Sequence, residues 1–163
     1  MVVLLMGTTG AGKTTIGQML ARQLGWTFLD ADDFHPAANI EKMTKGIPLT
    51  DEDRVPWLAA IHAELLRRSA LVEDVVLGCS ALKQKYRDAL SAGLEMKVVY
   101  LKGSYEEMLL HIQGRRGHFA GAAILAGQFA DLEEPKDAIM MDVSKTPEEI
   151  VAELRLKLKP ATA

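Results

Sequence analysis

The sequence is short of the residues that several protein classes need. A single cysteine, Cys79, among 163 residues excludes an intramolecular disulfide and a multi-cysteine zinc site. A strong excess of one charge is also missing, because 19 lysines and arginines stand against 22 aspartates and glutamates, a formal net charge of −3. This balance argues against a nucleic-acid coat protein or a polybasic membrane binder, since both need a large basic surface. It leaves room for a local basic pocket that binds a small anion.

Long hydrophobic runs and repeats are absent as well. Residues 1–6 are apolar, but they carry no basic leader and run directly into Gly7, so they are too short for a signal peptide or a membrane span. No segment repeats with a period of about 20 to 50 residues. Hydrophobic residues make up 48% and charged residues 25% of the chain, as in ordinary globular domains. We therefore expect one cytoplasmic domain over residues 1–163.

Short apolar runs alternate with helical patterns along the chain. The apolar runs predict β-strands at residues 2–6, 26–29, 75–77, 97–101 and 138–143. The first is apolar throughout, as expected of a strand buried on both faces of a parallel sheet. The alternation predicts an α/β fold, a doubly wound parallel sheet flanked by helices, and leaves the strand order open. In such folds ligands bind at the carboxyl ends of the strands.

Helical periodicity fills most of the gaps between these strands. It predicts a first helix with Ile16 and Leu20 on its apolar face and Gly25 at its end, and further helices over residues 57–71, 84–90 and 105–112. Thr146 has the features of an N-cap for a final helix, because proline follows it and acidic residues fill the first turn. Residues 31–57 are predicted to be turn-rich, because prolines and a glycine interrupt them.

A glycine-rich motif follows the first predicted strand. Residues 7–14 read Gly-Thr-Thr-Gly-Ala-Gly-Lys-Thr and match G-x-x-x-x-G-K-[ST] in full, between a strand and a helix as the motif requires. In such a P-loop the backbone N–H groups surround a polyphosphate at a helix N-terminus. Lys13 is expected to reach the β- and γ-phosphates, and the Thr14 hydroxyl to hold Mg²⁺. The motif predicts a nucleoside triphosphate site made by Gly7, Thr8, Thr9, Gly10, Ala11, Gly12, Lys13, Thr14 and Thr15.

Acidic residues follow the second predicted strand rather than the third. Hydrolases and switches with a P-loop place a Mg²⁺-binding aspartate after a later buried strand, but the strand at residues 75–77 leads to Ser80. Asp30, Asp32 and Asp33 follow the strand at residues 26–29 and are expected to face the phosphates from the side of the phosphoryl acceptor. A carboxylate there can orient or deprotonate a hydroxyl group. This arrangement favours a small-molecule kinase.

Basic side chains complete the predicted site. Arg115 and Arg116 begin a glycine-rich stretch, residues 115–127, which is typical of a mobile lid whose guanidinium groups cover the transferring phosphoryl. Arg54 and Lys83 add positive charge, which suits an anionic acceptor.

Three sequence blocks, together with the P-loop, resemble the gluconate kinases, a P-loop kinase family close to the shikimate kinases. The first block begins with Asp-Ala-Asp-Asp-Phe-His-Pro at residues 30–36. The second begins with Cys-Ser-Ala-Leu-Lys at residues 79–83, and the third with Arg-Arg-Gly-His-Phe at residues 115–119. With the P-loop, the resemblance covers residues 7–135. It implies a nucleoside and shikimate kinase-like P-loop fold with a substrate-binding helical insert near residues 31–71 and a lid near residues 115–127.

The resemblance also implies an activity, the transfer of the γ-phosphoryl group of ATP to the 6-hydroxyl of D-gluconate with Mg²⁺ as cofactor. It implies that Asp32 contacts the accepting hydroxyl, that Lys13 and Arg116 share the catalytic work, and that Arg115 joins the ATP site. Asp30 is expected near Mg²⁺, through water, beside Thr14. A homodimer is implied as well. The acceptor pocket is expected to contain Asp32, His35, Arg54, Ser80, Lys83 and Arg87.

A few positions depart from the family pattern. The family usually has valine and serine where this chain has Thr8 and Thr9, and an arginine, expected near the adenine, at the position of His111. Gly127 replaces a serine. Two alternatives stay open at this point: a kinase for shikimate or another small hydroxy acid, and a nucleotide-binding switch that has kept the fold without the transfer chemistry.

Overall fold

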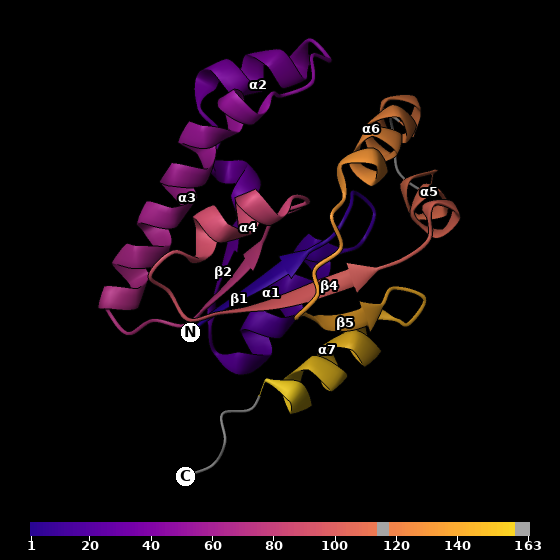
Figure 1. Ribbon diagram of the computed structural model, residues 1–163. Coiled ribbons are helices and arrows are strands. Elements are labelled where there is room, and N and C mark those ends of the chain that lie inside the picture. Colours follow the sequence, from indigo (N-terminus) through magenta and orange to yellow (C-terminus); the bar gives the residue numbers. More distant parts are fainter. Residues whose placement is uncertain (114–117, 159–163) are drawn as a thin grey trace.

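Five parallel β-strands form the centre of the computed structural model, which describes residues 1–113 and 118–158 (Figure 1). The strands lie in the spatial order β2-β3-β1-β4-β5. Every neighbouring pair is parallel, so the carboxyl ends of all the strands lie at one edge of the sheet. Their bounds are β1 (Val2–Met6), β2 (Thr27–Asp30), β3 (Val75–Gly78), β4 (Met96–Lys102) and β5 (Ile139–Asp142).

Helices cover both faces of this sheet. Side chains alternate along β1: Val3 and Leu5 join the core made with α1 and α7, and Leu4 and Met6 join the core made with α3 and α4. This burial on both faces explains why β1 is apolar throughout. The helices are α1 (Lys13–Leu24), the 3₁₀ turn η1 (Ala31–Phe34), α2 (Ala37–Thr44), α3 (Asp51–Ala70), α4 (Gln84–Ser91), α5 (Tyr105–Gln113), α6 (His118–Asp131) and α7 (Pro147–Lys157).

The predicted doubly wound α/β class is confirmed, and the predicted strands appear with ends shifted by at most one residue. Helix α1 ends at Gly25, whose φ of +71° is the left-handed conformation expected there. Helix α7 begins after Thr146, whose hydroxyl accepts from the Glu149 N–H while the Glu149 carboxylate accepts from the Thr146 N–H. This reciprocal pair is a capping box.

The turn-rich interpretation of residues 31–57 is wrong. The segment contains η1, α2 and the first two turns of α3, which starts after Thr50 rather than at Trp57. Thr50 and Asp53 form a second capping box, and three acidic residues in the first turn favour a helix start. Pro56 lies inside α3 and lacks a backbone N–H, so it removes one hydrogen bond of the helix without ending it.

The segment predicted to be a glycine-rich lid is helical where the structure describes it. Helix α6 starts at His118 and packs against α5, while Arg115 and Arg116 lie outside the described residues. Figure 1 shows α5 and α6 on one side of the strand ends and α2 with the start of α3 on the other. No helix in the described part of the chain has the length and apolar character needed to cross a membrane.

Candidate active site at the carboxyl edge of the sheet

The P-loop connects β1 to α1. Gly10 and Gly12 have φ values of +87° and +90°, a backbone region that strongly favours glycine. A Cβ atom on Gly10 would also come within 3.0 Å of the Met108 carbonyl oxygen on α5. The loop leads into the N-terminus of α1, where first-turn N–H groups lack intrahelical partners and attract anions. The predicted phosphate site therefore has the required backbone shape.

Two long side chains bond to the P-loop backbone. Lys13 donates from Nζ to the carbonyl oxygens of Gly7 and Thr8, at 2.9 and 3.0 Å. The N–H of Thr9 donates to Oε1 of Gln128 on α6, at 2.6 Å, and so joins the loop to a helix 119 residues away. The Thr8 hydroxyl is buried and has no hydrogen-bond partner among the described residues.

Residues of the predicted nucleotide site and residues of the predicted acceptor site line one cavity of about 150 Å³. The P-loop contributes one wall, the end of β2 contributes the two aspartates, and the end of β3 contributes Ser80. Cys79 lies in the same wall, but burial raises the pKa of its thiol to about 12, so it is not a thiolate nucleophile. The cavity is lined by Thr9, Lys13, Thr14, Asp30, Asp32, Gly78, Cys79, Ser80 and Gln128.

The two aspartates at the end of β2 differ in their surroundings. Asp30 caps η1, because its carboxylate accepts from the Asp32 N–H at 2.9 Å. The pKa of Asp32 is raised above its usual value, first by the desolvating protein around it and then by the negative charge of Asp30. Lys13 and His35 act in the opposite direction. The Asp32 side chain is 86% exposed, so an incoming hydroxyl group can reach this carboxylate.

His35 lies beside Asp32, with 3.9 Å between its Nε2 and Asp32 Oδ1. Its ring stacks on Trp57 of α3, with centroids 4.4 Å apart and planes 10° apart. Burial is the main cause that lowers the pKa of His35, so the ring is neutral near pH 7. Asn39 of α2, which is buried, contacts the other ring nitrogen at 3.3 Å.

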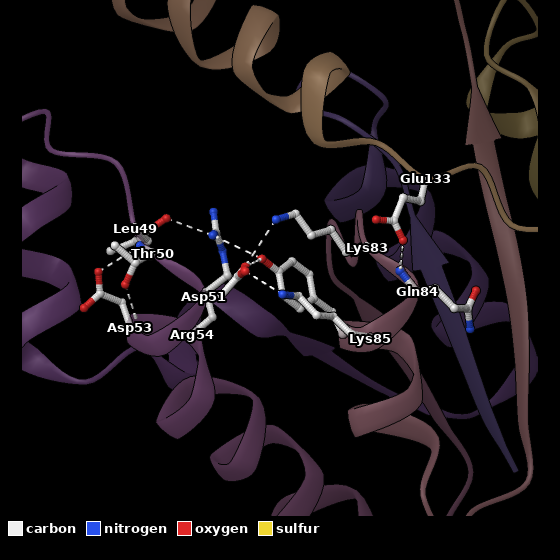
Figure 2. Close-up of polar contacts among 10 residues, drawn as sticks. Leu49, Thr50, Asp51, Asp53, Arg54, Lys83, Gln84, Lys85 and Glu133 are labelled. Atoms are coloured by element: carbon white, nitrogen blue, oxygen red, sulfur yellow. Dashed lines mark hydrogen bonds and ion pairs between the residues drawn. The ribbon is translucent and has the colours of Figure 1, made fainter.

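A second cluster joins α3 to the start of α4 (Figure 2). Asp51 accepts hydrogen bonds from Lys83, Lys85 and the Tyr86 hydroxyl, and these bonds hold its pKa well below the usual range. Arg54 donates to the Leu49 carbonyl oxygen at 2.8 Å and lies over the Tyr86 ring, 5.5 Å from its centroid. Two predicted acceptor-binding cations, Arg54 and Lys83, therefore both contact the Tyr86 ring.

Arg87 is placed apart from these cations. It is 3% exposed and donates to the carbonyl oxygens of Ala81 and Glu133, at 2.6 and 2.8 Å. Two further bonds go to the Gln84 side chain. Its guanidinium therefore fixes the turn between β3 and α4, the turn that carries Ser80 and Lys83.

His111 contacts the P-loop from α5. Its Nδ1 lies 2.8 Å from the Gly10 carbonyl oxygen, and it lines a cavity of about 350 Å³ between the loop and the start of α7. Thr15, the last residue of the predicted ATP site, lines this cavity, as do Thr146 and Pro147.

Several residues at the site had no predicted role. Gln128 bonds to the P-loop, Asn39 supports His35, and Asp51 with Tyr86 joins the cations. No spacing rule marks such residues: Asn39 follows His35 by only four residues, while Gln128 and Asp51 contact partners 119 and more than 30 residues away. The only sequence signal for these residues is the family resemblance: Asn39 continues the block that begins at residue 30, Tyr86 the block at residue 79 and Gln128 the block at residue 115.

A P-loop that faces an acidic strand end across one cavity, in a sheet of order 2-3-1-4-5, defines a P-loop kinase of small molecules. The family model described as shikimate kinase matches residues 9–158. The chain belongs to the gluconokinase family, within the shikimate kinase-like P-loop kinases.

Individual relatives support this placement over nearly the whole chain. A probable gluconokinase of Mus musculus is 43% identical, over 97% of this chain and 97% of its own. A gluconokinase of Gluconobacter oxydans is 42% identical, over 93% of this chain and 88% of its own. The crystal structure of a gluconokinase from Sinorhizobium meliloti superposes with a TM-score of 0.84 at 41% identity, over 93% of this chain and 87% of that chain.

Proposed function

We propose that this protein transfers the γ-phosphoryl group of ATP to the 6-hydroxyl of D-gluconate and so forms 6-phospho-D-gluconate. The observation that carries the proposal is the single cavity that joins Lys13 and Thr14 of the P-loop to Asp32 at the end of β2. A phosphoryl donor held by the loop and a hydroxyl held by the carboxylate meet in that cavity. The gluconokinase names of the relatives supply the acceptor.

The chemistry requires little beyond positioning and charge neutralisation. The P-loop N–H groups and Lys13 hold the phosphates and neutralise the charge that spreads over the transferring group. Asp32, with its raised pKa, orients the acceptor hydroxyl and takes its proton as the hydroxyl oxygen bonds to the γ-phosphorus. The bond from that phosphorus to the β–γ bridging oxygen breaks, and ADP leaves. Arg115 and Arg116, predicted to close over the phosphates, remain predictions.

Mg²⁺ fits the donor set at this site. The Thr14 hydroxyl and the Asp30 carboxylate line the same cavity, and both are the hard oxygen donors that Mg²⁺ prefers. We assign Thr14 as a direct ligand and Asp30 as a ligand through water. Held by these two residues, Mg²⁺ would neutralise part of the charge of the ATP phosphates.

The acceptor pocket is proposed to use His35, Arg54, Ser80 and Lys83 beside Asp32. Arg54 suits the gluconate carboxylate, because a guanidinium pairs with that group through two parallel hydrogen bonds. Arg87 acts through the turn it holds rather than by its own charge, since backbone carbonyls occupy its guanidinium. The helices α2 and α3, near residues 31–71, are proposed as the acceptor insert, and the lid near residues 115–127, which begins outside the described residues, stays a prediction.

The test is ADP release in a coupled assay with Mg²⁺ and ATP, run with D-gluconate, shikimate and related sugar acids, and without an acceptor. Release that requires gluconate is expected. ADP release with another acid alone would assign the pocket to that acid. ADP release without any acceptor would contradict the proposed kinase activity. The Lys13→Ala variant controls for a contaminating kinase.

The homodimer is proposed on the family resemblance, and the cytoplasmic location on the composition and the N-terminal residues of the sequence. Light scattering of the purified chain should give twice the monomer mass, and a monomer mass over the whole concentration range would contradict the dimer.

A further inference from the structure

Asn39 has its side-chain amide fixed by two neighbours. It is 3% exposed, and its Nδ2 lies 2.9 Å from the Asp53 carbonyl oxygen. A carbonyl oxygen accepts and cannot donate, so the atom facing it must be the amide nitrogen. The same nitrogen lies 3.3 Å from His35 Nδ1. The amide therefore presents its second hydrogen to the histidine ring.

The His35 ring is held in place on its flat face. Its side chain is only 6% exposed, and it stacks on Trp57, whose Nε1 donates to the Ala31 carbonyl oxygen at 2.7 Å. Burial and the nearby Arg54 both lower the pKa of His35, against the opposing charge of Asp32. A neutral imidazole carries one proton, on one of its two nitrogens.

We propose that Asn39 is a positioning residue that fixes His35 as the Nε2–H tautomer, so that this N–H donates to a hydroxyl group of the acceptor beside Asp32. The amide hydrogen occupies the lone pair of Nδ1, and the ring proton is left on Nε2. The role toward the acceptor rests on the proposed function, whereas the tautomer does not.

The geometry gives this tautomer a chemical consequence. Nε2 and Asp32 Oδ1 are 3.9 Å apart, too far for a direct hydrogen bond but suited to an oxygen atom about 2.8 Å from each. A hydroxyl in that position donates to the carboxylate and accepts from the imidazole. A carboxylate or carbonyl group accepts only, so it fails to satisfy Asp32. The pair therefore selects a hydroxyl group at the position where phosphoryl acceptance begins.

The first test is a long-range proton–nitrogen NMR spectrum of the ligand-free protein with ¹⁵N-labelled histidine, near pH 7.5. The His35 signals, assigned by their loss in His35→Gln, should show a proton on Nε2 and a bare Nδ1. A bare Nε2 or a doubly protonated ring would overturn the proposal. This measurement uses the wild-type chain and does not depend on any substrate.

The second test replaces the amide. In Asn39→Asp the carboxylate accepts from the ring, so the proton should move to Nδ1, while Asn39→Leu should leave a mixture of tautomers. Thr44→Ala, an exposed change on the same helix, is the matched control and should leave the His35 signals unchanged. A folded Asn39→Asp protein with the wild-type tautomer would contradict the role of Asn39.

Turnover then separates positioning from simple structural support. His35→Ala and Asn39→Asp should each lower kcat/KM for gluconate about tenfold with KM for ATP unchanged. His35→Gln keeps an N–H near the Nε2 position, so its kcat/KM for gluconate should be higher than that of His35→Ala. Equal losses in both His35 variants would overturn the donor role. If the wild-type protein does not turn over gluconate, the proposed function is contradicted. The tautomer of His35 is then decided by the NMR result alone.

Discussion

The two walls of the active cavity are built by different means. On the nucleotide side, the P-loop binds through backbone groups, held by glycines at φ near +90° between a buried strand and a helix start. On the acceptor side, Asp32, His35 and Arg54 act through side chains, which neighbouring side chains hold in place. A backbone site tolerates changes of side chain so long as the glycines stay. A side-chain site depends on every neighbour that supports it.

The two sides also differ in how they are buried. Helix α2 has one buried residue, Asn39. Ile40 and Met43 within the helix are exposed, and so is Ile47 after its end. Helix α1 instead buries an apolar stripe against the sheet. The nucleotide side is therefore part of the hydrophobic core, and the acceptor side is an outer layer joined by polar contacts.

Lys13→Ala should have the largest effect, because the backbone of the P-loop cannot replace the positive charge of this ammonium. We expect kcat to fall by at least about 100-fold and the affinity for ATP to fall as well. Steady-state kinetics and calorimetric titration with ATP measure the two effects. Unchanged ATP affinity would show that the backbone alone holds the nucleotide.

Asp32→Asn should affect only the acceptor side. We expect kcat to fall well over tenfold, because the amide cannot take the hydroxyl proton, while ATP binding stays close to normal. The same kinetics and titration apply. Near-full turnover would remove Asp32 from the acceptor site.

Arg54→Ala should raise KM for gluconate about tenfold or more and leave KM for ATP unchanged. Arg54→Lys should recover part of the loss, since it keeps the charge and loses the paired hydrogen bonds. The matched control is Lys85→Ala, because Lys85 lies over the same Tyr86 ring, 5.9 Å from its centroid, from a more exposed position. Equal effects of the two alanine variants would indicate a general charge effect.

The capping boxes at the starts of α3 and α7 can be compared directly. Thr50→Ala on α3 and Thr146→Ala on α7 should each lower the free energy of unfolding by about 1 kcal/mol. Only the Thr50 variant should raise KM for gluconate, because α3 carries Arg54 and the ring that supports His35. Thermal unfolding and initial rates provide the two measurements. A rise in KM from both would point to global loosening.

The smallest expected effect is a gain in stability. Thr8→Val removes a buried hydroxyl without a partner and keeps the side-chain shape, so the free energy of unfolding should rise by about 1 kcal/mol. ATP affinity should not change, because the backbone of the loop makes the site. A loss of affinity would show that this hydroxyl binds nucleotide.

How well each region could be predicted follows from the difference between a site built by the backbone and a site built by side chains. The sequence predicted β1, the P-loop and the Gly25 cap, because apolar runs and glycines at positive φ leave strong local signals. It missed α2, which buries an asparagine and no apolar side chain. Pro56 suggests a break in the sequence pattern, although the Thr50 and Asp53 capping box marks the true start of α3. The Asp51 cluster was unpredictable, since its contacts join elements more than 30 residues apart.

The hydrogen bond from the Thr9 N–H to Gln128 has a thermodynamic consequence for helix α6. Any ligand that takes this N–H must first break the bond to α6, so ligand and helix compete for one donor. Linkage then makes the effect reciprocal. Whatever draws α6 away from the loop strengthens the binding of such a ligand, and the ligand loosens α6 by the same free energy.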